Sequence, residues 1–314
     1  MVYEVRRLRL LRELAVHGTI ASTAQACHLT PSAVSQQLTL LEREAGTALL
    51  VRYGRRVILT EAARVLVGHT EQVLAQLERA RAEVAALGES VRGTVRLSTF
   101  PSAAVALAAP AIAACRAAHP DLRVVLDEAE PQASIDGLRH HECDVALVYE
   151  YSLLPRIRDA GVVLHPLLRE PLLAALPPGD GPPPGGDGAD ETVPLADLAG
   201  QPWIAPHSDA ALRTVLERAC QAAGFEPRLD FTSDDYTVIM SLVEAGLGVS
   251  LMPRLVAEPL SSNVRLVEVA GLRLTRTVSV AVRAGGADAP SVAALTTALR
   301  HAAQGADTEV LPPS

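Results

Sequence analysis

Uncharged side chains that both donate and accept hydrogen bonds gather within residues 30–39. They are Thr30, Ser32, Ser35, Gln36 and Thr39. At helical spacing they would share the outer face of one helix, a face that normally carries Glu, Lys or Arg. Base edges in the major groove of DNA require such donors and acceptors. We therefore expect this face to contact DNA bases, and the alternative is an ordinary polar surface.

Three arginines that follow this stretch could bind phosphate. Arg52, Arg55 and Arg56 lie in LLVRYGRRVILT, residues 49–60, where two apolar runs flank a turn at Tyr53. This pattern predicts a β-hairpin with arginines around its tip. Because arginine binds phosphate oxygens whatever the base sequence, the hairpin is expected to hold the DNA backbone. The alternative is a solvated, charged loop.

The elements that would position these side chains are three short helices. Apolar residues at helical spacing predict a helix over residues 5–18. The small residues of 19–27 predict a second helix, with Ser22 as its candidate N-cap. Thr30 and Pro31 suit the N-cap and first position of a third helix that ends near Ala45. Its inward face is expected to be Val34, Leu38 and Leu41.

At this point the sequence resembles the LysR-type transcriptional regulators of bacteria. The resemblance rests on LTPSAVSQQLxxLEREAG (Leu29–Gly46) and the following LLVRYGRRVILTEAA. It implies a winged helix-turn-helix over residues 1–60, a linker helix over 61–88 and a two-lobed sensing domain over 93–304 of the periplasmic-binding-protein type II fold. Many members carry Arg where Gln36 stands and Gln-Pro where Pro31-Ser32 stand, which leaves the operator bases open.

Residues 60–88 carry a heptad pattern between a candidate cap, Thr60, and a candidate end, Gly88. The seam is Leu66, Thr70, Val73, Leu77, Ala80, Val84 and Leu87. One alternative is an amphipathic helix that packs on its own domain. We expect instead a homodimer through paired linker helices, because a dimer presents two reading heads to a dyad-symmetric operator. The resemblance implies an antiparallel pairing and, in many members, tetramers.

The body alternates strands and helices, which predicts an α/β architecture with parallel-type sheets covered on both faces. Strands are expected at 94–100, 122–130, 144–150, 171–177, 229–233, 249–253 and 277–283, and helices at 102–118, 132–141, 210–223, 236–245 and 290–302. Lobe I is expected over 93–164 and 270–304, and lobe II over 166–268. The Pro/Gly/Asp-rich residues 178–190 predict a mobile surface insert.

A small-molecule effector is expected where the carboxyl ends of the strands meet helix N-termini. The candidate residues are Phe100, Ser102, Ala103, Glu130, Pro131, Gln132, Tyr149, His207, Ser208, Ser233 and Asp234. Members of the family that bind small acids often have Ser or Thr near Pro131. Because Glu130 and Pro131 stand here instead, our hypothesis is a polar or cationic effector with Glu130 as its counter-charge. The alternative is that Ser102 and Asp234 cap helices and that Glu130 is solvated.

Composition agrees with a DNA-binding head on an acidic body. The 314-residue chain has a net charge of −8, yet residues 1–60 hold 8 arginines against 4 glutamates, a net charge of +4. A polyanion is therefore expected to meet the head. The four cysteines form no CxxC pair, which predicts reduced thiols. The start lacks the pattern of a secretory signal, and the most apolar run, 103–115, contains Pro110, so we expect a cytoplasmic protein without membrane contact.

Two other classes of protein were weighed. An enzyme would need a site such as a metal centre at His140-His141-Glu142-Cys143 or a hydrolase site at His207-Ser208-Asp209. Neither has the ligand spacing or the glycine-framed nucleophile that such sites require, so no catalytic residue, metal or cofactor is expected. The body alone could be a transported-solute receptor, but the head argues against it. RNA polymerase remains a further possible partner.

Overall fold

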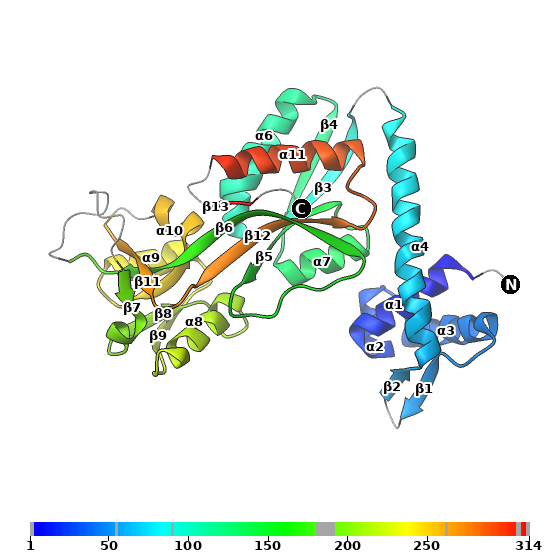
Figure 1. The fold of residues 1–314 in the computed structure, drawn as a ribbon, viewed down its shortest axis with the longest axis horizontal. Coiled ribbons are helices and arrows are strands. Elements are labelled where there is room, and N and C mark those ends of the chain that lie inside the picture. Colours follow the sequence, from blue (N-terminus) through cyan, green and yellow to red (C-terminus); the bar gives the residue numbers. More distant parts are fainter. Residues whose placement is uncertain are drawn as a thin grey trace.

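The structure is a computed structural model of the chain, and it describes residues 3–53, 56–88, 91–179, 192–260, 263–305 and 309–311. Figure 1 shows a small helical head, one long helix and an elongated two-lobed body. From residue 180 onward, the insert expected at 178–190 lies outside the described residues.

The head has the predicted order of three helices and a hairpin. Its elements are α1 (Val5–His17), α2 (Ile20–Ala26), α3 (Pro31–Ala45), β1 (Leu50–Tyr53) and β2 (Arg56–Leu59). Gly18 ends α1 in the left-handed conformation, with φ of 71°. The head has its own apolar core, formed by Leu8, Leu10, Leu11, Leu14, Ala24, Val34, Leu38, Leu41, Leu49 and Ala63. The inward face predicted for α3 is therefore confirmed.

Two helix caps in the head show how local chemistry sets the elements. Thr30 accepts a hydrogen bond from the Ala33 N–H at 3.2 Å, and Pro31 opens α3, as predicted. The expectation that Ser22 caps α2 is wrong. The cap is Thr19, whose hydroxyl accepts from the Ser22 N–H at 3.1 Å, because α2 begins directly after the turn at Gly18.

The linker helix α4 (Glu61–Ala86) begins at Thr60, which accepts from the Ala63 N–H at 3.2 Å. Its 26 residues span about 39 Å at the usual rise per residue. The face that meets the body contains Glu71, Leu74, Ala75 and Glu78. The predicted seam lies on the other side of the helix, where Val84 and Leu87 are 70% and 84% exposed. The C-terminal half of the seam is therefore exposed, whereas Leu66 packs against the head core and Thr70 is buried.

Lobe I is built on a sheet whose strands begin in the predicted places. β3 (Gly93–Thr99) pairs in parallel with β4 (Leu122–Glu128) and β5 (Val145–Tyr151). The helices α6 (Ala109–Ala118) and α11 (Pro290–Gln304) contribute to the larger core of this lobe. The helix α7 (Pro131–Arg139) contributes Ile135 and Leu138 to a separate smaller core.

Two long strands join the lobes, so the sheet is mixed rather than parallel as expected. β6 (Val162–Leu176) and β12 (Thr275–Arg283) pair antiparallel with each other. With β11 (Arg265–Ala270) and β7 (Thr192–Pro194), the strand order is β4-β3-β5-β12-β6-β11-β7. Only residues 171–177 were expected to be extended in the β6 region. The earlier half went unpredicted because Pro166 interrupts it, and the pairing is irregular at that place, between Val278 and Ser279.

Lobe II contains the remaining elements. The strands are β7 (Thr192–Pro194), β8 (Pro202–Ala205), β9 (Arg228–Thr232), β10 (Ser250–Pro253) and β11 (Arg265–Ala270), and the helices are α8 (Ala211–Ala222), α9 (Tyr236–Glu244) and α10 (Arg254–Leu260). A 3₁₀ turn at Leu195–Leu198 and a short strand β13 (Glu309–Val310) complete the described chain. Of these, β7, β8, β11, β13 and α10 were not predicted. The only tryptophan, Trp203, is buried in the core of this lobe.

Among the residues that the structure describes, one helical run has the length and composition of a membrane span. It is Pro101–Ala118, with a mean hydropathy of 1.4, and it comprises α5 (Pro101–Ala103), a π-helical stretch (Ala104–Ala108) and α6. Its residues Leu107, Ala111 and Cys115 are buried in the core of lobe I. The run therefore has the character of a core helix of the body.

Candidate functional site

The outer face of α3 is available for contact. Thr30, Ser32, Gln36 and Thr39 are exposed and Ser35 is half-buried, on the side opposite the buried core residues. The Thr30 and Ser32 hydroxyls lie 3.0 Å apart, and the Thr39 hydroxyl donates to the Ser35 carbonyl at 3.0 Å. Within the described residues, the Gln36 amide makes no hydrogen bond. It is thus the side chain of this face best placed to bind an external group.

The hairpin carries the predicted arginines to one end of the head. β1 and β2 pair antiparallel, with Arg52 opposite Val57 and Tyr53 opposite Arg56. Arg55 lies outside the described residues, and only the backbone is described for Arg52 and Arg56. Figure 1 shows the hairpin pointing from the head away from the body, beyond the start of the linker helix. Helix and hairpin therefore have the order of a winged helix-turn-helix.

A cavity of about 600 Å³ opens between the lobes of the body. Seven of the eleven predicted effector residues line it: Phe100, Ser102, Glu130, Pro131, Gln132, Tyr149 and Asp234. The other four do not. Ala103 is fully buried in the core of lobe I, and His207 pairs with Asp234 at 2.8 Å. Ser233 accepts a hydrogen bond from the Asp235 N–H at 3.1 Å, and Ser208 is absent from the lining.

Carboxylates dominate the charged lining of this cavity. They are Glu128, Glu130, Glu150, Asp209 and Asp234. Glu130 accepts a hydrogen bond from the Tyr149 hydroxyl at 2.5 Å. Burial, and then this hydrogen bond, raise the pKa of Tyr149 well above its ordinary value, so the phenol keeps its proton. The cavity therefore has a negative potential at neutral pH.

The only arginine in the lining, Arg276, is already paired. Its Nε donates to Glu170 Oε1 at 2.7 Å, and its Nη1 donates to the Ser102 hydroxyl at 3.2 Å. Burial lowers the pKa of Arg276, but the Glu170 charge together with Tyr151 and Tyr236 outweighs burial and raises that pKa, so the pair is ionic. Because Glu170 neutralises it, Arg276 offers little net positive charge to a ligand.

Sequence reasoning missed both members of this pair. Glu170 stands in the apolar run LLREPLLAAL, and Arg276 stands at the start of the strand TRTVSVAV. Each is a single charge of opposite sign in an apolar strand, and buried charges require a partner, so the sequence could have predicted that the two pair. Ser102 does not cap a helix as the alternative supposed; it accepts from Arg276. The cap of α9 is Asp235, not Asp234.

Aromatic side chains are concentrated at the cavity. The chain has one Trp, five Tyr and three Phe, and four of these nine line it: Phe100, Tyr149, Tyr151 and Tyr236. The Tyr149 ring lies 4.8 Å from that of Phe100 and 5.1 Å from that of Tyr151. Aromatic faces next to carboxylates attract organic cations.

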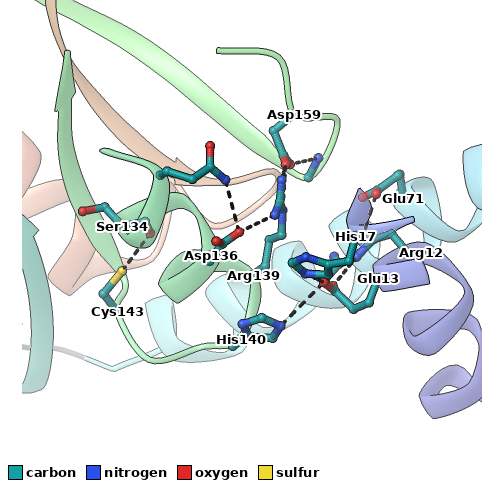
Figure 2. A network of polar contacts seen from close by, with 12 residues as sticks. Arg12, Glu13, His17, Glu71, Ser134, Asp136, Arg139, His140, Cys143 and Asp159 are labelled. Carbon is teal, nitrogen blue, oxygen red and sulfur yellow. Dashed lines mark hydrogen bonds and ion pairs between the residues drawn. The ribbon is translucent and has the colours of Figure 1, made fainter. Parts of the chain in front are cut away.

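The residues considered as a metal site form instead the turn after α7 and meet the head. His140 Nε2 lies 3.6 Å from Glu13 Oε2 on α1, and His141 Nδ1 lies 3.7 Å from Glu78 Oε1 on α4. Figure 2 shows His140 directed toward Glu13 between the two domains. No group of three or more His, Cys, Asp or Glu that could hold a metal ion occurs in the part of the chain that the structure describes.

Comparison with known proteins agrees with this architecture. Residues 5–64 match the family "Bacterial regulatory helix-turn-helix protein, lysR family", and residues 88–304 match "LysR substrate binding domain". The nitrogen assimilation regulatory protein nac of Klebsiella aerogenes is 27% identical over 294 residues, 93% of this chain and 92% of that protein. The dual regulator OxyR of Escherichia coli K12 is 27% identical over 256 residues, 81% and 80% of the two chains.

Solved structures share the fold of the whole chain. A full-length OxyR variant from Pseudomonas aeruginosa has a TM-score of 0.58 at 22% identity, covering 96% of this chain and 95% of that one. Full-length CbnR in complex with its target DNA has a TM-score of 0.51 at 23% identity, covering 96% and 100%. The family consists of transcription regulators, not enzymes. This chain belongs to the LysR family of bacterial transcriptional regulators.

Proposed function

We propose that this regulator reads a dyad-symmetric operator with the outer face of α3 in the major groove. The observation that carries the proposal is the exposed row of uncharged side chains, Thr30, Ser32, Gln36 and Thr39, opposite a fully buried core face. Ser35 lies at the edge of this row. Arg52, Arg55 and Arg56 of the hairpin hold the phosphate backbone.

A gel-shift assay on the intergenic DNA upstream of the gene for this chain tests the proposal. We expect retardation that unlabelled specific DNA competes away and unrelated DNA does not. Gln36→Ala is expected to reduce that preference. Gln221→Ala, an exposed glutamine on α8 of lobe II, is the matched control and is expected to bind as the wild type does. Equal competition by both DNAs would contradict base reading by α3.

The functional unit is a homodimer joined by the linker helices. Val73, Leu77, Val84 and Leu87 of the seam are exposed on the single chain. The N-terminal half of α4 borders a largely apolar groove of about 500 Å³ on the head, lined by Tyr3, Leu8, Ala45, Thr47, Leu49, Glu61, Ala62, Val65, Leu66, His69, Thr70 and Val73. An antiparallel pairing brings the exposed C-terminal half of one helix onto the groove of the other. Both apolar surfaces are then buried.

Sedimentation equilibrium with matched variants tests this interface. Val84→Glu places a charge on the seam and is expected to shift the protein toward monomer. Gln72→Glu adds the same charge to the same helix outside the seam and is expected to leave the dimer intact. A monomeric wild type, or equal weakening by both variants, would contradict the linker-helix dimer.

The cavity between the lobes binds a small organic cation. Five carboxylates and four aromatic rings line it, whereas its one arginine is neutralised by Glu170. Glu130, the N-cap residue of α7, is the proposed counter-charge. A hydrogen bond from the Tyr149 hydroxyl holds its carboxylate in place. The remaining contacts come from Phe100, Ser102, Pro131, Gln132 and Asp234. The sequence-predicted Ala103, His207, Ser208 and Ser233 are left out of this site because they do not line the cavity.

Calorimetry with a panel of probes tests the effector class. Choline, agmatine and spermidine represent organic cations, and benzoate and succinate represent organic acids. We expect heat from at least one cation and its loss in Glu130→Gln, while Glu226→Gln, an exposed glutamate of lobe II away from the cavity, changes nothing. Tight binding of a carboxylate that is unaffected by Glu130→Gln would contradict a cationic effector.

The remaining assignments follow from this role. We take the domain boundaries as 1–60, 61–88 and 93–304, with lobe I at 93–164 and 270–304 and lobe II at 166–268. A cytoplasmic location fits a protein that must reach operator DNA. Pairing of dimers into tetramers and contact with RNA polymerase fit the same role.

A further inference from the structure

The turn that follows α7 contacts α1, the end of α2, the turn before α3 and the linker helix α4. His140 meets Glu13 of α1 and also the thiol of Cys27 at the end of α2. His141 meets Glu78 of α4, and Glu142 lies 3.7 Å from His28 in the turn before α3. This surface, residues 139–142, is therefore where lobe I holds the head, and we refer to it as the docking turn.

Two charged side chains at the docking turn are buried. The side chains of Glu13 and Arg139 are only 3% and 7% exposed. Burial raises the pKa of Glu13, but contact with His140 and the charge of Arg12 outweigh it and lower that pKa to about 2. Contacts with Cys27 and Glu13 raise the pKa of His140 to about 10 against the effect of burial. Both groups are therefore charged at neutral pH.

The backbone is strained on both sides of this interface. Among the described residues other than glycine, His28 and His141 have positive φ, at 52° and 60°. Residues held in this region of φ cost free energy and cluster where a structure has two states. Gly285 also approaches the linker helix so closely that a Cβ there would lie 2.2 Å from the Ala75 carbonyl oxygen.

The opposite end of the same helix lies in the effector cavity. α7 has only nine residues, and Glu130, Pro131 and Gln132 at its start line that cavity. A row of side chains runs along the helix: Gln132 Nε2 donates to Asp136 Oδ1 at 3.4 Å, and Arg139 Nη1 donates to the same oxygen at 2.5 Å. Arg139 Nε then donates to Asp159 Oδ2 at 2.7 Å.

This row ends beside a second group of polar side chains on α1 and α4. Asp159 Oδ1 accepts from the Gly161 N–H at 2.8 Å, and Gly161 lies against Glu71 and Arg12. Arg12 Nε is 3.9 Å from Glu71 Oε1, and Arg12 also donates to Glu13. Figure 2 shows two neighbouring groups of side chains, Asp136, Arg139 and Asp159 near the end of α7, and Arg12, Glu13 and Glu71 on α1 and α4. Polar contacts therefore run from the cavity along α7 to Gly161, which packs next to Glu71 and Arg12, and His140 at the end of α7 contacts Glu13 of the first helix of the head.

We propose that α7 couples the effector cavity to the head, so that a ligand contacting Gln132 shifts the balance between a head docked on lobe I, as in this structure, and a released head. The coupling rests on the proposed role of the cavity. A ligand that binds the Gln132 amide removes its hydrogen bond to Asp136, and Asp136 then orients Arg139 differently. Coupling of this kind is reciprocal, so a substitution that weakens docking of the head must also change the conformational equilibrium at the cavity.

Hydrogen exchange on the full-length protein tests the coupling without any effector or DNA. Arg12→Gln removes the charge on α1 that faces lobe I. Arg7→Gln is the control, because Arg7 lies on the same helix but pairs with Glu4 and Glu44 inside the head. We expect Arg12→Gln to speed exchange in the first turn of α7 about threefold or more, and Arg7→Gln to leave α7 unchanged.

The reverse experiment starts at the cavity. Gln132→Ala is expected to speed exchange in the last turns of α1 and in residues 71–78 of α4. Asp209→Asn, which lines the same cavity from lobe II, is expected to leave the head unchanged. Changes confined to the site of each substitution would overturn the coupling, and they would leave the DNA-binding and effector assignments standing.

Gly285→Ala provides a second route to a released head, should Arg12→Gln fail to fold. The added Cβ collides with the backbone of α4, whereas Gly271→Ala has a similar φ of 79° with nothing within 4 Å. We expect Gly285→Ala, and not Gly271→Ala, to reproduce the faster exchange in the first turn of α7. Unchanged α7 exchange in Gly285→Ala, with faster exchange at the docking turn, would also overturn the proposal.

Discussion

Glu170 and Arg276 form a buried ion pair at the junction of the two lobes, 106 residues apart in the chain, with Arg276 Nε 2.7 Å from Glu170 Oε1. Both residues are 1% exposed. They stand on β6 and β12, the two strands that run through both lobes. Glu170 also accepts from the Leu255 N–H at 2.6 Å, so the pair ties lobe II to the floor of the cavity.

Breaking this pair is expected to destabilise the body. Glu170→Gln keeps the shape but leaves the Arg276 charge uncompensated, which costs about 3–5 kcal/mol of unfolding free energy. Denaturant unfolding followed by fluorescence of the buried Trp203 measures it. The double variant Glu170→Leu with Arg276→Met is expected to lose less unfolding free energy than Glu170→Gln alone, because no buried charge is left without a partner. A loss below about 1 kcal/mol in Glu170→Gln would contradict an ionic pair.

Docking of the head is expected to weaken as pH rises above neutrality. His140 is held charged in the docked state with a pKa of about 10 and returns to the ordinary value near 6.5 when exposed. Its contribution is therefore complete below pH 6.5 and is lost as pH rises through 10. The groups that face it are Glu13 and Cys27, with Arg12 and His17 next to Glu13.

Small-angle X-ray scattering measures this effect as an increase in the radius of gyration between pH 7 and pH 10 in the wild type, a window set by the two pKa values of His140. His140→Gln cannot titrate and is expected to show no increase over that range. The same pH trend in both proteins would show that another group is responsible.

Base reading by Gln36 is expected to be local to one position of the operator. Gln36→Ala removes an exposed amide from α3 and should cost about 1–3 kcal/mol of binding free energy on the native operator. Binding to operators altered at each position in turn locates the contact, because the variant loses discrimination at only one base pair. Equal loss of affinity for every operator sequence would instead assign Gln36 to the backbone.

Arg56 at the hairpin is expected to act on phosphate. Arg56→Ala should weaken binding to all DNA sequences alike and reduce the slope of log K against log salt by about 1. Binding isotherms at several salt concentrations measure the slope. Arg43→Ala, an exposed arginine at the last turn of α3, serves for comparison. A slope unchanged by Arg56→Ala would remove the hairpin from the DNA interface.

Local signals made the head and linker predictable from the sequence. Thr30 and Pro31 set the start of α3, and Val34, Leu38 and Leu41 set its inward face through helical spacing alone. The heptad pattern likewise located α4, and its seam is exposed from Val73 onward, whereas Thr70 is buried on the single chain. These features depend on residues within a few turns of one another.

Features that depend on distant residues were missed. The pairing of Glu170 with Arg276 joins two strands far apart in sequence. The contacts of the docking turn were not predicted, because Glu13 and Glu78, the partners of its histidines, lie in the head and the linker helix. Four of the predicted effector residues missed the cavity, because strand ends alone do not determine which side chains face it.

Footprinting tests the central claim most directly: that two α3 helices, held by paired linker helices, lie in successive major grooves of an operator. The purified protein is applied to its own upstream DNA, with its mass measured in the same buffer. We predict a dimer or larger assembly that protects two inverted half-sites about one helical turn, or a whole number of turns, apart. A monomer that leaves this DNA unprotected even at low ionic strength would contradict the account.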